Sequence, residues 1–349
     1  MFDMVVVGCG PAGASALRRG AELGLRVLGV ERCKMPRRKP CAGVLYPRVL
    51  EDFKVPREAV VSELRGVRLV APSGREAFVA FEEPGAMVDR AAFDHALVKL
   101  AVEAGAKVVE GAPSTLVGLA EGGCRLVVEG LGPVESRFIV AADGVYSTIA
   151  RGLGLAWGRR ELALALQAYA KPPRLSEEGV FEVRYDPGRL PGGWRWIAWR
   201  RDVALVGVGQ LLELAGSPLK LRAELRRSLE ELGLSPFMEE AYMLPLKGPR
   251  GLEGLVHGGA VLLVGDAGGF VRSDTGEGIY YAMHSGEAAA EAVAEALGGA
   301  RLSEAFREEL EERGLLQLYG ASELHEALRS VEAAEEFVGR VARLSLKAP

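Results

Sequence analysis

The first 31 residues show the pattern of a β-strand, a helix and a second β-strand. Residues 3–8 (DMVVVG) form a continuous apolar run that ends at a glycine, which is typical of a buried parallel strand. Residues 11–24 carry small and apolar side chains at helical spacing, and residues 26–31 (RVLGVE) form a second apolar run. A strand, a glycine-rich turn, a helix and a strand in this order predict a βαβ unit.

The rest of the chain divides into two textures. Further buried strands are predicted at 106–111, 137–144 and 260–266, and the longer helical patterns cover 89–104 and 278–297. Between these, short alternating strands separated by turns predict an antiparallel sheet with one helix at 218–233.

We therefore expect an α/β protein with a discontinuous nucleotide-binding domain of the Rossmann type. The predicted limits are 1–155 and 256–300 for that domain, 156–255 for an antiparallel β-sheet substrate domain, and 301–349 for a C-terminal helical tail.

Composition excludes several classes of protein. The chain has 349 residues and a net charge of −4 without a basic block, so nucleic acid is not an expected partner. No apolar run approaches the roughly 18–20 residues of a membrane span, and MFDMVVVG does not resemble a signal peptide. Four cysteines at spacings that match no zinc pattern predict reduced thiols, no metal site and a cytoplasmic protein. The absence of Asn and the scarcity of Gln suggest a thermophilic source.

Residues 8–13 (GCGPAG) match G-x-G-x-x-G directly after the first predicted strand. Gly8 permits a tight turn, Gly10 lets the backbone approach a pyrophosphate, and Gly13 lets the helix lie close to the strand. Glu31 ends the second strand, where an acidic residue accepts hydrogen bonds from ribose hydroxyls. The pattern predicts dinucleotide binding; the alternative is a structural turn with Glu31 as a solvated strand end.

A second candidate segment follows the strand at 260–266. Asp266 comes at the end of that strand, and a glycine-rich loop leads through Gly278 and Ile279 into the next helix. An Asp at a strand end can accept hydrogen bonds from ribityl hydroxyls, and a helix N-terminus favours negative charge. Asp-Gly loops before helices are common, so this segment supports flavin binding only together with the N-terminal pattern.

Taken together, the motifs resemble a known family. GCGPAG, DRAAFDHAL at 89–97, AADGVYS at 141–147 and the segment 265–286 resemble the flavoproteins that include aromatic hydroxylases. Within that group, KPCAGVL at 39–45 and the stretch 192–209 are most similar to geranylgeranyl reductases, which saturate isoprenoid double bonds. The resemblance departs from the family at Ala198-Trp199, which replaces Phe-Pro, and at Cys41-Ala42, which replaces Cys-Gly.

The resemblance implies FAD as cofactor and a set of residues that contact it. The ADP half would lie against Gly8, Gly10, Ala12, Gly13, Glu31, Arg32 and Ser114. The flavin half would lie against Ala42, Gly43, Leu45, Arg90, Asp143, Gly144, Asp266, Gly278 and Ile279, with Arg90 as a cationic clamp.

Cys41 and two tryptophans are the candidates for the reaction itself. Cys41 could donate a proton beside the isoalloxazine, or it could simply be a small buried side chain. Trp194 and Trp196 alternate and therefore share one face of a strand, where they could line a substrate cavity or a core.

These observations lead to one functional hypothesis and two alternatives. We expect an FAD-dependent reductase of isoprenoid C=C bonds, with geranylgeranyl chains of archaeal-type membrane lipids as its prenyl lipid substrate. The alternatives are an FAD-dependent aromatic monooxygenase and an electron-transfer flavoprotein. NAD(P)H or a reduced carrier such as ferredoxin would supply electrons, and a peripheral membrane contact remains open.

Overall fold

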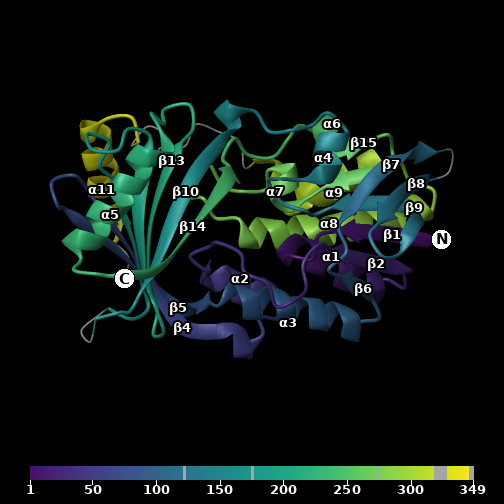
Figure 1. Cartoon of the computed structure of the whole chain (residues 1–349), viewed down its shortest axis with the longest axis horizontal. Coiled ribbons are helices and arrows are strands. Elements are labelled where there is room, and N and C mark those ends of the chain that lie inside the picture. The colour runs from purple at the N-terminus through teal and green to yellow at the C-terminus, as the bar shows by residue number, and fades with distance from the viewer. Residues whose placement is uncertain (121–122, 174–176, 274, 318–327, 346–349) are drawn as a thin grey trace. The chain divides into compact units, whose positions relative to one another are not determined.

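The computed structural model describes all residues except 121–122, 174–176, 274, 318–327 and 346–349 (Figure 1). The chain forms two compact units, each assembled from three separate segments. The first unit contains Met1–Arg37, Asp94–Gly158 and Pro245–Gly320, and the second contains Arg38–Phe93, Arg159–Leu244 and Ala321–Pro349.

The first unit is built on a largely parallel sheet that runs in the order β15, β16, β9, β1, β2, β6. The central strand β1 (Phe2–Val7) lies between β2 (Val27–Glu31) and β9 (Gly132–Ala141), and Met4, Val5 and Val6 are fully buried. The other strands of this path are β6 (Lys107–Glu110), β16 (Val261–Leu263) and β15 (Val256–His257), and only β15 pairs antiparallel. The hairpin β7 (Ser114–Ala120) and β8 (Gly123–Val128) pairs antiparallel with the early part of β9.

Two helices of the first unit pack against each other through small residues. They are α1 (Pro11–Glu22) and α8 (Ile279–Leu297), which lie side by side (Figure 1). An ideal Cβ at Gly286 would lie 2.1 Å from the carbonyl oxygen of Ala12, so only glycine permits this approach. The remaining helical segments in or entering this unit are α3 (Arg90–Glu103), α4 (Thr148–Gly152), α6 (Leu252–Leu255), α7 (Gly265–Gly268), α9 (Leu302–Glu312) and the 3₁₀ turn η3 (Leu315–Gln317).

The second unit is built on a sheet of eight strands in the order β14, β10, β13, β12, β11, β4, β5, β3. The strands are β3 (Val44–Leu45), β4 (Val60–Val70), β5 (Glu76–Val88), β10 (Leu162–Ala170), β11 (Val180–Arg184), β12 (Gly193–Trp199), β13 (Ala204–Leu211) and β14 (Pro236–Pro245). Strand β4 pairs parallel with β11, whereas β10 with β13, β13 with β12, β12 with β11, β4 with β5, and β5 with β3 pair antiparallel.

The second unit differs from the sequence-based expectation in two respects. Residues 38–93 belong to it, although we expected them in the nucleotide-binding domain, because β4 pairs its backbone with β11. The predicted C-terminal tail is divided: α9 belongs to the first unit and α11 (Val331–Ser345) to the second, where Ala334 and Val338 pack near Tyr185. The apolar faces of these strands and helices could pack on either sheet. Their sequence pattern therefore does not indicate to which unit they belong.

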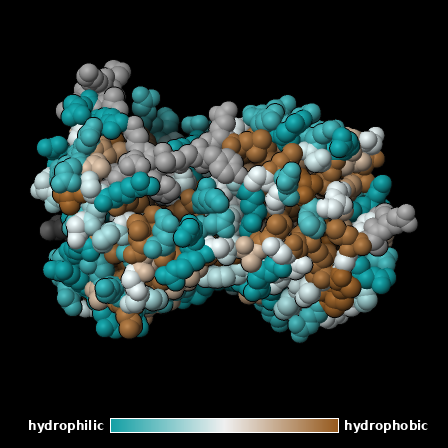
Figure 2. Space-filling model, turned by 90° about the horizontal axis from the view of Figure 1, so that it is seen from above, coloured by the Kyte–Doolittle hydropathy of each residue, from teal (hydrophilic) through white to brown (hydrophobic). Residues whose placement is uncertain are grey.

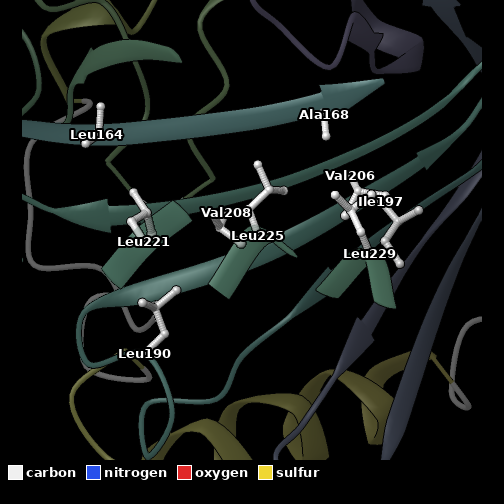
Figure 3. Packing of buried hydrophobic residues seen from close by; sticks show 9 residues of the cluster. All are labelled: Leu164, Ala168, Leu190, Ile197, Val206, Val208, Leu221, Leu225 and Leu229. Carbon is white, nitrogen blue, oxygen red and sulfur yellow. The ribbon is translucent and has the colours of Figure 1, made fainter. Parts of the chain in front are cut away.

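Helix α5 (Pro218–Glu231) covers one face of the second sheet. Leu221, Leu225 and Leu229 recur at i, i+4 and i+8 and pack on strand residues such as Ile197 and Val208 (Figure 3). Side chains alternate along a strand, so the strand residues next to Ile197 and Val208 in sequence point to the opposite face of the sheet, away from α5. The short segments α2 (Pro47–Asp52), η1 (Arg57–Ala59) and η2 (Arg159–Glu161) complete this unit.

The surface carries apolar as well as polar residues. Figure 2 shows hydrophobic residues among hydrophilic ones on the face that it displays. In the part of the chain that the structure describes, no helix combines the length and the apolarity needed to cross a bilayer.

Candidate functional site

The glycine-rich loop between β1 and α1 has the geometry that a pyrophosphate-binding turn requires. Gly8 has φ of +90°, and its N–H donates to the carbonyl oxygen of Val30 at 2.8 Å. An ideal Cβ on Gly13 would lie only 1.8 Å from the carbonyl oxygen of Gly8, so a side chain at this position is sterically excluded. Gly10 caps α1 without a capping side chain, which leaves the first-turn amides of Ala12 and Gly13 available for an anion.

Glu31 at the end of β2 is buried beside this loop. Its carboxylate accepts hydrogen bonds from the backbone N–H groups of Cys9, at 2.9 Å, and Cys33, at 3.1 Å. These two hydrogen bonds hold the side chain at the end of the strand. Because Glu31 is buried, the alternative of a solvated strand end is excluded. Arg32, the next predicted contact, is exposed. Burial, together with the charge of Glu31, raises the pKa of the Cys9 thiol and keeps it neutral.

Arg37 is a residue of this site that we did not predict. Its guanidinium Nη1 lies 2.7 Å from Oδ2 of the fully buried Asp94, and its Nε lies 3.7 Å from Glu31. Its Nη2 lies 3.3 Å from the ideal Cβ position of Gly10, so a positive charge stands directly beside the glycine loop. Asp94 lies in the DRAAFDHAL motif, but no local spacing indicates that it pairs with a residue 57 positions earlier.

Asp143 and Ser114, both in the first unit, are linked through Thr148. Oδ2 of Asp143 accepts hydrogen bonds from the backbone N–H and the hydroxyl of Thr148, at 2.7 and 3.0 Å. The same hydroxyl lies 3.4 Å from the carbonyl oxygen of Ser114. Oδ1 of Asp143 is buried and has no partner among the described residues. A buried carboxylate oxygen of this kind is expected to bind a ligand or a water molecule. Gly144 follows with φ of +80°.

Gly265, at the start of the second predicted motif, lies against the glycine loop. An ideal Cβ on Gly265 would lie 3.0 Å from the Cβ of Ala12, and the N–H of Gly265 donates to the buried hydroxyl of Ser285 at 3.1 Å. Oδ1 of Asp266 lies 3.8 Å from the ideal Cβ position of Gly278, the residue that caps α8. The structure thus brings the two predicted FAD motifs of the first unit together, and Ile279 begins the helix that packs on α1.

In the second unit, the loop with Cys41 is held by backbone pairing. The N–H of Gly43 lies 3.4 Å from Sγ of Cys41, and its carbonyl oxygen accepts from the N–H of Val88 at 2.8 Å. Leu45 follows in β3, pairs with β5 and is fully buried, while Cys41 and Ala42 are half-buried. Arg90 begins α3 and is also buried.

A polar network beside Cys41 was not predicted. Nε2 of Gln167 donates to the carbonyl oxygen of Cys41 at 3.3 Å and to the hydroxyl of Tyr169 at 3.0 Å. That hydroxyl donates to Glu240 at 2.7 Å, and Arg38 pairs with the same carboxylate at 3.2 Å. Burial first, and then the hydrogen bond to Glu240, raise the pKa of Tyr169, so the phenol stays protonated. In the sequence, this network was indicated only by the polar side chains of Gln167 and Tyr169 at alternate positions of one strand.

The indole rings of Trp194 and Trp196 lie over the glycines of the neighbouring strand. An ideal Cβ on Gly207 would lie 2.0 Å from the Trp196 ring, and one on Gly209 would lie 2.5 Å from the Trp194 ring. The register pairs Trp196 with Gly207 and Trp194 with Gly209, and the two indole centroids are 6.5 Å apart. The sequence VGVG at 206–209 carried this signal, since a glycine inside a strand often marks a close approach.

Two of these features fit the ADP and ribityl parts of a flavin dinucleotide. The glycine cradle with its uncapped helix accommodates a pyrophosphate, and the buried, unpaired Oδ1 of Asp143 calls for a hydrogen-bond donor. The individual FAD contacts stay predictions, as do the roles of Cys41 and the two tryptophans.

Comparison with known proteins decides the family. The chain is 32% identical over 307 residues to the geranylgeranyl diphosphate reductase of Rhodobacter capsulatus, which covers 83% of this chain and 74% of that protein. It is 33% identical over 329 residues to digeranylgeranylglycerophospholipid reductase 1 of Methanopyrus kandleri, with 89% and 85% covered. The chain belongs to the geranylgeranyl reductase family of FAD-dependent oxidoreductases. A third relative, the menaquinone reductase of Mycolicibacterium smegmatis, is 33% identical over 319 residues, with 83% and 75% covered.

Solved structures confirm the fold of the family. The geranylgeranyl bacteriochlorophyll reductase-like protein of Thermoplasma acidophilum superposes with a TM-score of 0.87 at 24% identity, covering 98% of this chain and 91% of that one. No family model matches the sequence. The predicted α/β class and the resemblance are thus confirmed, whereas the predicted archaeal and thermophilic source stays a prediction.

Proposed function

We propose that this protein binds FAD and saturates C=C bonds of isoprenoid chains, with the geranylgeranyl chains of archaeal-type membrane lipids as its substrate. The proposal is carried by the close approach of Gly265 and helix α8 to Ala12 of the glycine loop, within one unit of a geranylgeranyl reductase family member. When bound, FAD supplies the hydride-transfer chemistry.

The residues of the first unit would bind and orient the cofactor. The amides of Ala12 and Gly13 would bind the pyrophosphate, and the positive end of the α1 dipole would add to their attraction. Glu31 is already held by two backbone N–H groups, so it can accept ribose hydroxyls without reorganisation. Arg37 pairs with Asp94 and lies near Glu31, and its guanidinium would attract the negative charge of the phosphates.

The other end of the cofactor would meet Asp266 and the N-terminus of α8. Gly278 caps this helix of 19 residues without a side-chain hydrogen bond, so its first amides can favour negative charge on a flavin ring. Asp266 stands near that helix end, where its carboxylate can accept a hydrogen bond from a ribityl hydroxyl.

Cys41 is our candidate for the proton that completes the saturation of a double bond. The thiol would give its proton to one alkene carbon while the neighbouring carbon receives a hydride. Its loop is held by Gly43 and by Gln167, which suits a group that must keep a defined position. The electrons would come from NAD(P)H or from a reduced carrier such as ferredoxin.

The names of the relatives leave the headgroup of the substrate open. They mention geranylgeranyl diphosphate, digeranylgeranylglycerophospholipid and menaquinone. These molecules share a prenyl chain and differ in the polar group attached to it. We propose a lipid substrate of the archaeal type because, of these three relatives, the digeranylgeranylglycerophospholipid reductase aligns with the largest share of this chain.

Two measurements test the proposal in sequence. Titration of the protein with FAD should quench flavin fluorescence to a one-to-one endpoint, and protein that takes up no FAD would refute it. Dithionite-reduced holoprotein is then incubated with digeranylgeranylglycerophospholipid, geranylgeranyl diphosphate and menaquinone, and products are analysed by mass spectrometry. We expect a mass gain of about 2 Da for each bond reduced.

A matched pair of cysteine variants tests the proton donor. Cys41→Ala should slow product formation by roughly 10²-fold, which is the lower range for general acid catalysis. Cys124→Ala, a buried cysteine of β8, is the control and should leave the rate unchanged. An unchanged rate in Cys41→Ala would remove the thiol from the mechanism, while the rest of the proposed function would stand.

A further inference from the structure

Among the buried polar atoms of the second unit for which the described residues provide no hydrogen-bond partner, two belong to uncharged side chains. They are the carbonyl oxygen Oε1 of Gln167 and the indole nitrogen Nε1 of Trp196. Gln167 is 3% exposed and Trp196 is 8% exposed, so bulk water does not satisfy either group. A buried acceptor and a buried donor of this kind are costly unless something binds them.

Strand register places the two residues on the same face of the sheet and close together. Gln167 of β10 pairs with Gly207 of β13, and Gly207 pairs with Trp196 of β12. Directly opposite residues of antiparallel strands share a face, and this face is the one that α5 does not cover (Figure 3). Strand β13 lies between the strands of the two residues, and its residue at this position, Gly207, has no side chain to separate them.

The indole of Trp196 extends over that glycine. Its Cε2 atom, to which Nε1 is bonded, lies 2.0 Å from the ideal Cβ position of Gly207. The edge of the indole that carries Nε1 therefore lies over β13, the strand between those of Trp196 and Gln167. The backbones of β10 and β12 are two strand spacings apart, about 10 Å, and the indole over Gly207 together with the long side chain of Gln167 reaches into this space from both sides, which leaves room for one small group between them.

The orientation of the Gln167 amide follows from its neighbours. The carbonyl oxygen of Cys41 only accepts hydrogen bonds, so the NH₂ group of Gln167 must face it. The same NH₂ group donates to Tyr169, whose own proton goes to Glu240. Oε1 is consequently an acceptor with a defined position, and the network behind it holds it there.

We propose that Gln167 Oε1 and Trp196 Nε1 form a subsite for a single hydroxyl group, either of the ligand or of a bound water molecule. The indole N–H donates a hydrogen bond to the oxygen of that hydroxyl, and the hydroxyl O–H donates a hydrogen bond to Oε1. A phosphate ester or a quinone carbonyl satisfies only the indole and leaves Oε1 unpaired. The subsite therefore favours a prenyl compound that carries an alcohol group, and in this respect it rests on the proposed function.

The test compares a prenyl alcohol with the same molecule unable to donate a hydrogen bond. Geranylgeraniol and its methyl ether are titrated calorimetrically into the FAD-loaded protein in one detergent. One hydrogen bond is worth about threefold to tenfold in affinity, so the wild-type protein should prefer the alcohol by that factor. Gln167→Met and Trp196→Phe, which remove the acceptor and the donor, should bring the preference close to one.

Matched controls come from the opposite face of the same sheet. Gln210→Met removes a buried glutamine whose Nε2 donates to the carbonyl oxygen of Pro191, and Trp199→Phe removes an indole that packs towards α5. Both controls should keep the preference for the alcohol. If one of the two variants does not fold, as judged by circular dichroism, the other variant is compared with the wild-type protein, and the crystal structure of the wild-type protein with bound geranylgeraniol shows directly whether the hydroxyl lies between the two atoms.

The two sources of the hydroxyl are separated by a crystal structure of the wild-type protein. A preference for the alcohol that the two variants lose assigns the subsite to the ligand. Equal affinities together with an ordered water within hydrogen-bond distance of both atoms assign it to water. Equal affinities and no water between the two atoms would overturn the proposal. None of these outcomes depends on turnover, so a failed reductase assay does not affect them.

Discussion

Gly13→Ala tests whether the first turn of α1 is as tightly apposed to β1 as the structure indicates. The added Cβ would lie 1.8 Å from the carbonyl oxygen of Gly8, whereas real Cβ contacts are essentially never under 3.0 Å. The helix would have to recede by at least 1.2 Å, which is the difference of these two distances. Because the opposing atom belongs to the backbone, no side-chain rotation can relieve the overlap.

The expected cost is at the upper end of the range for overpacked substitutions, about 3 kcal/mol in the free energy of unfolding. The same displacement moves the amides of Ala12 and Gly13 away from the pyrophosphate position. We therefore expect FAD affinity to fall on the order of 10²-fold, since two charge-assisted hydrogen bonds are weakened.

Urea denaturation followed by circular dichroism measures the first effect, and flavin fluorescence titration measures the second. Gly152→Ala is the matched control, because Gly152 ends helix α4 of the same unit and an added Cβ would meet nothing within 4 Å. The control should be neutral or slightly stabilising. A Gly13→Ala protein with wild-type unfolding and wild-type FAD affinity would refute the close approach and with it our account of the glycine loop.

Three further predictions concern other parts of the chain. Glu31→Ala leaves the N–H groups of Cys9 and Cys33 without their acceptor and should weaken FAD binding by about 1.5–3 kcal/mol in a fluorescence titration; an unchanged dissociation constant would remove Glu31 from the site. Gly207→Ala puts a Cβ 2.0 Å from the Trp196 ring and should cost about 2 kcal/mol in urea denaturation and shift tryptophan emission, whereas Gly118→Ala in open space should do neither. The pKa of Glu309 is raised from 4.5 to about 7, chiefly by burial and then by the neighbouring Glu291, so its protonated form is favoured in the folded state. This contribution is present below pH 4.5 and is lost as pH rises through 7; after allowance for screening we expect the wild-type protein to lose on the order of 1 kcal/mol of stability between pH 5 and 8, and a Glu309→Gln variant with the same slope would contradict this.

The local features of the site followed from the sequence because each depends on a short stretch of chain. The apolar run before residue 8 predicted β1, and the glycine spacing predicted the turn that the structure shows. Alternation placed Trp194 and Trp196 on one face of β12, and helical periodicity predicted α5 and α8. The motifs taken together indicated the family, which the comparisons confirmed.

The pairings between distant segments required the tertiary structure. Arg37 meets Asp94 across 57 positions, and Gln167 meets Cys41 across 126 positions. The parallel pairing of β4 with β11 assigned residues 38–93 to the second unit, although their hydrophobic pattern suited either sheet. Spacing along the chain carries no information on such contacts.

The sequence by itself therefore determined which segments become strands and helices and which turn can hold a dinucleotide. These properties depend on backbone conformation and on periodic burial, which neighbouring residues impose. Only the tertiary structure decided which charges lie beside the glycine loop and which polar atoms, such as Oε1 of Gln167, are buried without a partner. Burial and hydrogen bonding are properties of all the segments that surround a group, and the chain brings those segments together only when it folds.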